Sequence, residues 1–274
     1  MFTLNCKGRL LEISSPIVMG IINITPDSFY SGSRKPSIEE ALHTAEKMLS
    51  EGAVILDIGG QSTRPGANAL TAAEETERVI PVIEAISREF PQSFLSVDTY
   101  SSAVARAAVE HGAAIVNDIS GGNFDNDMLS TVASLHVPYV CMHVKGTIKT
   151  MHTDPQYSDV TKEVLDYFIE RTATCTKAGI NDIIIDPGLG FSKNSTHNFQ
   201  LLKHLEAFSI FRKPLLLGIS RKSTIYKTLG ITAEEALNGT TVLNTAGLLK
   251  GASILRVHDV KEAEEAIKLV SRLR

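Results

Sequence analysis

The stretch Ile17-Val-Met-Gly-Ile-Ile-Asn23 is an apolar run that ends on a polar residue, and Ala53-Val-Ile-Leu-Asp57 and Phe94-Leu-Ser-Val-Asp98 repeat this pattern. Nearly continuous runs of valine, isoleucine and leucine are typical of strands that are buried on both faces, as in a parallel sheet. Five further runs of this kind follow, at residues 115–117, 139–143, 183–186, 215–220 and 254–258. The sequence therefore predicts eight parallel strands.

Stretches with helical periodicity separate these runs, among them residues 72–89, 160–178 and 233–250, and the run Ser220-Arg-Lys-Ser223 indicates the start of another helix. Ser37-Ile-Glu-Glu40 has the pattern of a capping box at the start of the first helix. Eight strand–helix units in 274 residues average about 34 residues each, which fits a single (β/α)8 TIM barrel. We expect a short N-terminal β-hairpin over residues 1–15 and the barrel over residues 16–274. An open doubly wound sheet is the alternative, and the absence of a dinucleotide-type glycine fingerprint counts against it.

The composition excludes several classes of protein. Lysine plus arginine number 27 and aspartate plus glutamate 31, so the formal net charge is −4, whereas a surface that coats nucleic acid normally carries a basic excess. The sequence has no apolar run near the ~20 residues of a membrane span and no signal-peptide pattern. The three cysteines are widely spaced, as in reduced proteins. We expect a cytoplasmic protein whose partners include neither nucleic acid nor membrane.

Polar side chains follow nearly every predicted strand, at the end where the active sites of such barrels lie. The strand ends carry Asn23, Asp57, Asp98, Asn117, His143, Asp186, Ser220-Arg221-Lys222, Arg256 and His258. A single polar residue at such a position is often only a helix cap. Eight polar ends of mixed charge indicate a binding site instead.

The charges at these ends suggest two subsites. Asp98, Asn117 and Asp186 offer acceptors for a planar heterocycle with several N–H donors, and a buried site of this kind discriminates strongly. Basic side chains at the rim suit a phosphate or pyrophosphate. They are Arg64, Arg256, His258 and Lys222. The Asn23 amide either ligates Mg²⁺ that also contacts a substrate phosphate or forms a turn before Thr25-Pro26.

Seven motifs, in chain order, resemble those of the dihydropteroate synthase family. They are Met19-Gly-Ile-Ile-Asn-Ile-Thr-Pro-Asp-Ser-Phe29, Asp57-Ile-Gly-Gly-Gln-Ser-Thr-Arg-Pro-Gly66, Ser96-Val-Asp-Thr99, Asn117-Asp-Ile-Ser-Gly121, Asp186-Pro-Gly-Leu-Gly-Phe191, Gly218-Ile-Ser-Arg-Lys-Ser223 and Arg256-Val-His-Asp-Val260. The resemblance implies a (β/α)8 transferase of folate biosynthesis that is a sulfonamide target. It would join 6-hydroxymethyl-7,8-dihydropterin pyrophosphate to p-aminobenzoate, forming 7,8-dihydropteroate and pyrophosphate.

The resemblance also implies a role for each matching residue. The pterin would be bound by Asp98, Asn117, Asp186, Lys222 and Arg256. The pyrophosphate would be bound by Asn23, Arg64, Arg256 and His258. The p-aminobenzoate pocket would consist of Phe29, Thr63, Pro65, Phe191, Lys222 and Ser223. Mg²⁺ would be the cofactor, held by Asn23, and the catalytic groups would be Asp98, Lys222 and Arg64.

Two other functions remain as alternatives, a pterin-dependent methyltransferase and a catalytically silent pterin-binding relative. The Ser62-Thr-Arg-Pro-Gly66 loop and the intact pyrophosphate cations favour the synthase. The chain departs from the family pattern at Gln61, where glutamate is usual, after Phe29 at Tyr30, and at Lys145. The resemblance further implies a homodimer.

Overall fold

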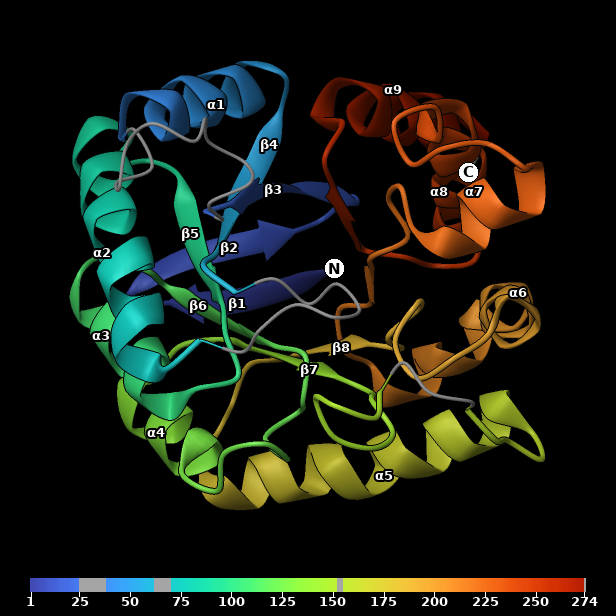
Figure 1. Cartoon of the computed structure of the whole chain (residues 1–274), viewed down its shortest axis with the longest axis horizontal. Coiled ribbons are helices and arrows are strands. Elements are labelled where there is room, and N and C mark those ends of the chain that lie inside the picture. The colour runs from blue at the N-terminus through green and yellow to red at the C-terminus, as the bar shows by residue number, and fades with distance from the viewer. Residues whose placement is uncertain (25–37, 62–69, 152–154, 274) are drawn as a thin grey trace.

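The computed structural model describes residues 1–24, 38–61, 70–151 and 155–273 and contains a parallel barrel at its centre, seen from one end in Figure 1. The barrel strands are β3 (Ile17–Asn23), β4 (Ala53–Gly59), β5 (Phe94–Asp98), β6 (Ile115–Asp118), β7 (Tyr139–Met142), β8 (Ile183–Asp186), β9 (Leu216–Leu217) and β10 (Ile254–Val257). Strands β3 to β8 pair in chain order, and β10 lies between β3 and β9. A parallel bridge between Ile185 and Leu215 joins β8 to the β9 segment and closes the ring. The predicted TIM barrel is confirmed.

Two strands differ from the predicted length by two or more residues, and β6, β7 and β10 differ by one. β4 continues two residues beyond Asp57, to Gly59, and β9 spans only Leu216–Leu217 of the predicted 215–220. The pairing of β9 with β10 ends at Leu217, opposite Leu255, and the chain then turns at Ser220-Arg221, where Arg221 has a left-handed φ of 52°.

Helices surround the barrel on its outside (Figure 1). They are α1 (Ile38–Ser50), α2 (Ala72–Glu89), α3 (Ser102–Glu110), α4 (Met128–Leu135), α5 (Val160–Ala178), α6 (Ser195–Lys203), α7 (Ser223–Leu229), α8 (Leu237–Leu249) and α9 (Val260–Val270), with 3-10 turns at Leu205–Phe211 and Ser271–Leu273. Thr71 and Glu74 form a capping box that begins α2. The box predicted at Ser37 lies outside the described residues. Two helices, α7 and α8, connect β9 to β10. The helix expected after Ser220-Arg-Lys-Ser223 is α7, and the one predicted over 233–250 is α8, which begins at Leu237.

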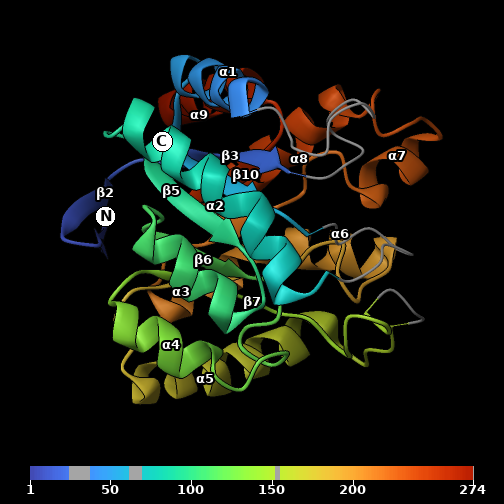
Figure 2. The same cartoon turned by 60° about the vertical axis from the view of Figure 1, so that its left-hand side comes forward.

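The N-terminal hairpin closes the bottom of the barrel. Strands β1 (Phe2–Cys6) and β2 (Arg9–Ile13) pair antiparallel, and their alternate residues are buried. These residues pack into one apolar cluster with the first residues of the barrel strands. The cluster contains Leu4, Cys6, Leu11, Ile13, Ile17, Met19, Ile55, Ala114, Ile115, Val140, Ile184, Leu216 and Ile254. Figure 2 shows the hairpin at one end of the barrel and helices α6 and α7 at the other.

The larger core lies between the barrel and its helices and includes buried aromatic and aliphatic side chains such as Phe168, Phe208 and Ile83. Among the described helices, none combines the length and the apolar character that crossing a bilayer requires. The cysteines Cys6, Cys141 and Cys175 are free thiols and buried.

Candidate active site

An arginine between two carboxylates lies at the mouth of the barrel. The guanidinium of Arg256, on β10, donates from Nε to Asp57 Oδ2 and from a terminal nitrogen to Asp98 Oδ2, each at 2.6 Å. Asn117 Nδ2 donates to the same Asp57 oxygen at 2.8 Å, so its amide oxygen is oriented away from Asp57. Strands β4, β5, β6 and β10 therefore bring their polar ends to one point.

Asp57 is fully buried, and among the described residues its Oδ1 atom has no hydrogen-bond partner. An unpaired buried carboxylate oxygen is costly, and such atoms need an explanation such as a ligand or ordered water that completes the site. The sequence placed Asp57 at a strand end without a binding role. Its position shows that it holds Arg256 and Asn117 in place.

Burial dominates the electrostatics of this cluster. Burial raises the pKa of Asp98 to about 7. The positive charge of Arg256 acts to lower this pKa, and the negative charge of Asp57 acts to raise it. The pKa of Arg256 lies above its ordinary value, because the attraction of Asp57 and Asp98 outweighs burial. The guanidinium is therefore always charged, whereas Asp98 titrates near neutral pH.

The second half of the mouth combines Asp186, Lys222 and Phe191. A Cβ atom added to Gly218 would lie 3.8 Å from both Asp186 Oδ2 and Lys222 Nζ, so the acid and the ammonium share this corner. Lys222 Nζ lies 4.4 Å from the centre of the Phe191 ring and donates to the carbonyl oxygen of Leu189. Burial lowers the pKa of Lys222 to about 8, with Asp186 acting in the opposite direction. Burial raises the pKa of Asp186, against the nearby Lys222 charge.

Glycines let the β8–α6 loop approach this corner closely. Gly188 has φ +70°, and a Cβ atom there would lie 2.1 Å from the carbonyl oxygen of His143. Gly190 has φ +85°, and its added Cβ would lie 2.7 Å from Lys222 Cδ. Any other residue at either position would clash or strain the backbone.

The rim holds Ser220, Arg221, Ser223 and His258. His258 Nδ1 lies 3.0 Å from Ser220 Oγ. Partial burial and the charge of Arg256 hold the pKa of His258 below its usual range, at about 4, so the ring is neutral in the free protein and an anion would have to raise its pKa. Arg221 makes a two-point ion pair with Asp259, at 2.8 Å for each bond. Ser223 begins α7 beside Lys222.

Asn23 lies exposed at the end of β3, and a Cβ atom added to Gly59 would be 3.8 Å from its Oδ1 and 3.6 Å from Asp98 Oδ2. The described residues contain no group of three His, Cys, Asp or Glu side chains that could hold a metal ion. A single exposed amide oxygen nevertheless fits Mg²⁺, which uses few protein ligands together with phosphates and water. The residues present therefore fit a metal that arrives with a phosphorylated substrate.

The described residues bring seven of the predicted site residues to the mouth of the barrel or its rim. They are Asn23, Asp98, Asn117, Asp186, Lys222, Arg256 and His258. Phe191 and Ser223 lie beside Lys222. Phe29, Thr63, Arg64 and Pro65, along with Tyr30, lie outside the described residues, so their roles stay predictions. Of the departures, Gln61 accepts a hydrogen bond from the backbone of Leu70 at 3.3 Å, and Lys145 pairs with Glu163 at 3.1 Å.

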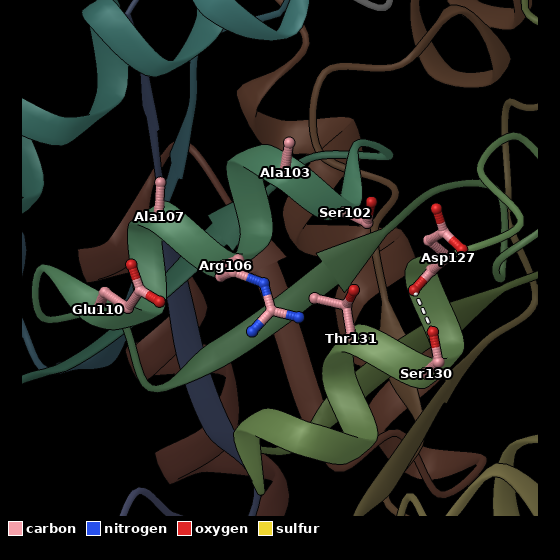
Figure 3. Close-up of a pocket in the computed structure, with 8 residues that line it drawn as sticks. All are labelled: Ser102, Ala103, Arg106, Ala107, Glu110, Asp127, Ser130 and Thr131. Carbon is pink, nitrogen blue, oxygen red and sulfur yellow. Dashed lines mark hydrogen bonds between the residues drawn. The ribbon is translucent and has the colours of Figure 1, made fainter.

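A groove elsewhere lies between α3 and α4, on the outside of the barrel (Figure 3). Its wall includes Arg106 and Glu110 from α3 and Thr131 from α4, while Ser130 Oγ donates to the backbone of Asp127. The groove lies on the helix faces, away from the strand ends and the carboxylates described above. It does not contribute to the site.

Comparison with known proteins agrees with this arrangement. The family model described as pterin binding enzyme matches residues 19–258. The dihydropteroate synthase of Escherichia coli K12 is 44% identical over 266 residues, which are 96% of this chain and 94% of that protein. The chain therefore belongs to the dihydropteroate synthase family of pterin-binding enzymes.

Solved structures give the same result. A Xanthomonas albilineans dihydropteroate synthase with 4-aminobenzoic acid is 40% identical, with a TM-score of 0.92, and the match covers 99% of this chain and 97% of that one. A Yersinia pestis dihydropteroate synthase in complex with a sulfonamide drug is 40% identical, with a TM-score of 0.93, and the match covers 100% and 99% of the two chains.

Proposed function

We propose that this chain catalyses the dihydropteroate synthase reaction of folate biosynthesis at the mouth of its barrel. It joins 6-hydroxymethyl-7,8-dihydropterin pyrophosphate to p-aminobenzoate and releases pyrophosphate. The observation that carries the proposal is the convergence of Asp98, Asn117 and Asp186 beside Lys222, an array that matches the N–H donors and the carbonyl group of a pterin. Structures of the relatives with 4-aminobenzoic acid and with 7,8-dihydropteroate support it.

Each half of the mouth has its own task in this proposal. Asp98, Asn117 and Asp186 accept the ring N–H groups of the pterin, and Arg256 covers its open face. Arg256 is paired with Asp57 and Asp98 in the free protein, so the pterin competes for these carboxylates when it enters. Phe191, Lys222 and Ser223 contact p-aminobenzoate, together with Phe29, Thr63 and Pro65. Asn23, Arg64, Arg256 and His258 bind the pyrophosphate.

The chemistry proceeds by departure of the leaving group first, because a neutral aniline nitrogen is a modest nucleophile. The bond from the pterin methylene carbon to the pyrophosphate oxygen breaks, and its electron pair leaves with pyrophosphate. The cation that remains is delocalised into the pterin ring, and ionised Asp98 stabilises it electrostatically. The amine of p-aminobenzoate then forms the new C–N bond and loses a proton to solvent.

Two side chains and a metal ion offset the negative charge of the pyrophosphate in this scheme. Arg64 and His258 contribute positive charge, His258 after the anion has raised its pKa. Asn23 would hold Mg²⁺ together with the substrate phosphates, and the ion would supply Lewis-acid stabilisation of the pyrophosphate. We expect Phe29 and Arg64 to help exclude water, which would otherwise trap the cation.

Three further properties belong to the proposal. Sulfonamides compete with p-aminobenzoate, as the sulfonamide complex of the Yersinia pestis relative suggests. The enzyme acts in the cytoplasm, where its three free thiols stay reduced. Two copies pair through the last helices, where Val242, Leu249 and Leu269 expose more than half of their surface.

The variant Arg64→Ala tests whether the departing pyrophosphate needs this positive charge. We expect turnover to fall by roughly 100-fold, since one cation that stabilises the leaving group is lost, with the affinity for a pterin lacking pyrophosphate unchanged. Arg88→Ala, an exposed arginine at the end of α2, is the matched control.

The order of departure and attack is tested on the wild-type enzyme, which without p-aminobenzoate should release pyrophosphate slowly. Complete absence of that release would contradict departure before attack.

A further inference from the structure

A buried lysine that the mechanism does not use belongs to the β8–α6 loop itself. Lys193 is 8% exposed, and its ammonium contacts four acceptors. Its Nζ atom lies 2.9 Å from His143 Nδ1 and 3.3 Å from the carbonyl oxygen of His143, and 3.0 Å from each of the carbonyl oxygens of Gly188 and Phe191. Within the described part of the chain, no carboxylate pairs with it.

Burial lowers the pKa of Lys193 to about 7, with the charge of Asp186 acting in the opposite direction. A buried ammonium without an ion-pair partner is costly, so its retention requires a compensating interaction. Three carbonyl oxygens and an imidazole nitrogen provide one here. Burial and the Lys193 charge hold the pKa of His143 far below its usual range, so the ring is neutral and Nδ1 accepts the lysine hydrogen bond. The acceptors come from two different segments, the end of β7 and the loop after β8. Lys193 therefore cross-links these segments.

The cross-linked loop carries the ring beside Lys222. The Phe191 carbonyl is bound by Lys193, and the Phe191 ring lies under Lys222 Nζ. Lys222 in turn binds the carbonyl of Leu189, the next residue after Gly188. Lys193 and Lys222 thus both bind backbone carbonyl groups of this loop. Lys193 has no contact with the cluster of Asp57, Asp98 and Arg256.

We propose that Lys193 is a positioning residue for p-aminobenzoate, because its ammonium fixes the backbone that carries Phe191 without touching substrate itself. This inference rests on the proposed placement of p-aminobenzoate beside Phe191. It separates the two substrates, since the loop contributes Phe191 to one pocket while the pterin is bound chiefly by the strand ends. Losing Lys193 therefore weakens p-aminobenzoate binding selectively.

The test compares Lys193→Met, which keeps the length of the side chain and removes its donors, with Lys203→Met, an exposed lysine on α6. We expect Lys193→Met to raise the KM for p-aminobenzoate about tenfold, with the KM for the pterin pyrophosphate within about threefold of wild type. Lys203→Met changes neither. Lys193→Arg, which keeps the charge, should restore part of the loss. If Lys193→Met does not fold, the same ratio of KM values is measured in Lys193→Gln.

Hydrogen exchange gives a readout without substrate. The amides of Gly188, Gly190, Phe191 and Ser192 are each hydrogen-bonded, to Asp186, Asn198, Gly188 and Met151 respectively. Lys193→Met should speed their exchange and leave the amides of α2 unchanged. Unchanged exchange in this loop, or equal increases in both KM values, would overturn the proposal.

A parallel Phe191→Ala variant separates the two possible failures. If Phe191→Ala raises the p-aminobenzoate KM and Lys193→Met does not, the positioning role is wrong and the pocket stands. If neither variant changes that KM although the loop exchanges faster, p-aminobenzoate binds elsewhere, and both the pocket assignment and this role of Lys193 are overturned.

Discussion

The two ends of the barrel both bury side chains and are chemically opposite. At the bottom, the first residues of the strands and the hairpin form a cluster of apolar side chains. At the top, the last residues of the same strands bury Asp57, Asn117, Asp118 and Asp186, with His143 beside them. One end is held together by apolar contact, and the other by hydrogen bonds and ion pairs. Stability and chemistry are therefore assigned to opposite ends of the same strands.

The polar end avoids the full cost of burial through shared partners. Arg256 neutralises two carboxylates at once, and Asp118 accepts four hydrogen bonds, from Ser120 Oγ, the amides of Ser120 and Gly122, and Tyr139. Breaking such an arrangement by removing one member leaves a buried charge unpaired, which costs about 3–5 kcal/mol. The apolar end has no such dependence. A substitution there costs packing and cavity energy and leaves the site unchanged.

The largest effect on substrate binding is expected for Asp186→Ala at the polar end. The pterin N–H donors lose their buried acceptor, and each charged hydrogen bond contributes about 1.5–3 kcal/mol, so affinity should fall roughly 100-fold or more. Calorimetric titration with a pterin analogue measures this. Asp182→Ala, an acid beyond the opposite end of β8 that binds the hairpin at Asn5, is the control and should keep full pterin affinity. Unchanged affinity in Asp186→Ala would remove Asp186 from the pterin site.

Asp57→Ala should lower the free energy of unfolding by about 3–5 kcal/mol, because Arg256 and Asn117 both lose a buried partner. Urea unfolding measures the change. Asp259→Ala breaks the partly exposed pair with Arg221 and should cost clearly less. Equal losses of unfolding free energy in the two variants would show that burial of the Asp57 network does not raise the cost of breaking it.

At the apolar end, Leu11→Ala should lower the free energy of unfolding by about 2–4 kcal/mol through loss of a side chain that is 3% exposed. Leu10→Ala, next to it and 65% exposed, should change it by less than about 0.5 kcal/mol. Both variants should keep the wild-type KM for each substrate. A changed KM in Leu11→Ala would mean that the two ends of the barrel are coupled.

The smallest effect near neutral pH is the titration of Asp98. Its raised pKa means that the carboxyl takes up a proton as the pH falls through about 7 and loses the charge that stabilises the pterin cation. The value of kcat/KM for the pterin pyrophosphate should therefore halve at the pKa and fall about tenfold one pH unit below it. The free energy of unfolding changes with pH in the opposite direction. The folded protein binds this proton more tightly than the unfolded chain does, so the free energy of unfolding decreases as the pH rises from about 4 to 7.

Glu75→Gln is the control for this profile. Burial also raises the pKa of Glu75 to about 7, and Asp98 contributes to the shift. The acid limb should persist in Glu75→Gln because Glu75 lies on α2 behind Gly60, outside the mouth. If the limb disappears in that variant, the titrating group is Glu75 and Asp98 is ionised throughout.

The sequence predicts the apolar end almost completely and the polar end in part. Runs of valine, isoleucine and leucine report a buried strand directly, and the bounds of α2 and α5 agree with the predicted ones. Strand ends located Asp98, Asn117 and Asp186, because a parallel barrel brings such ends together. The link of Asp57 to Arg256 spans 199 residues and has no local signal.

Lys193 is another residue whose partners the sequence does not predict. A lysine next to an asparagine at a helix start is usually exposed, and only the fold places it under three carbonyls. The Ser220-Arg-Lys-Ser223 run indicates a helix start, and α7 begins at Ser223, but neither the end of β9 at Leu217 nor the left-handed Arg221 has a signal in the sequence. Non-local partners and backbone exceptions thus account for most of what the sequence did not show.

The most direct test of the account is a steady-state assay of the wild-type protein with 6-hydroxymethyl-7,8-dihydropterin pyrophosphate, p-aminobenzoate and Mg²⁺. The account predicts 7,8-dihydropteroate and pyrophosphate in equal amounts, with Leu11→Ala active and Asp186→Ala inactive under the same conditions. Pterin binding without product, as a silent relative would show, or product formation that survives in Asp186→Ala would contradict it.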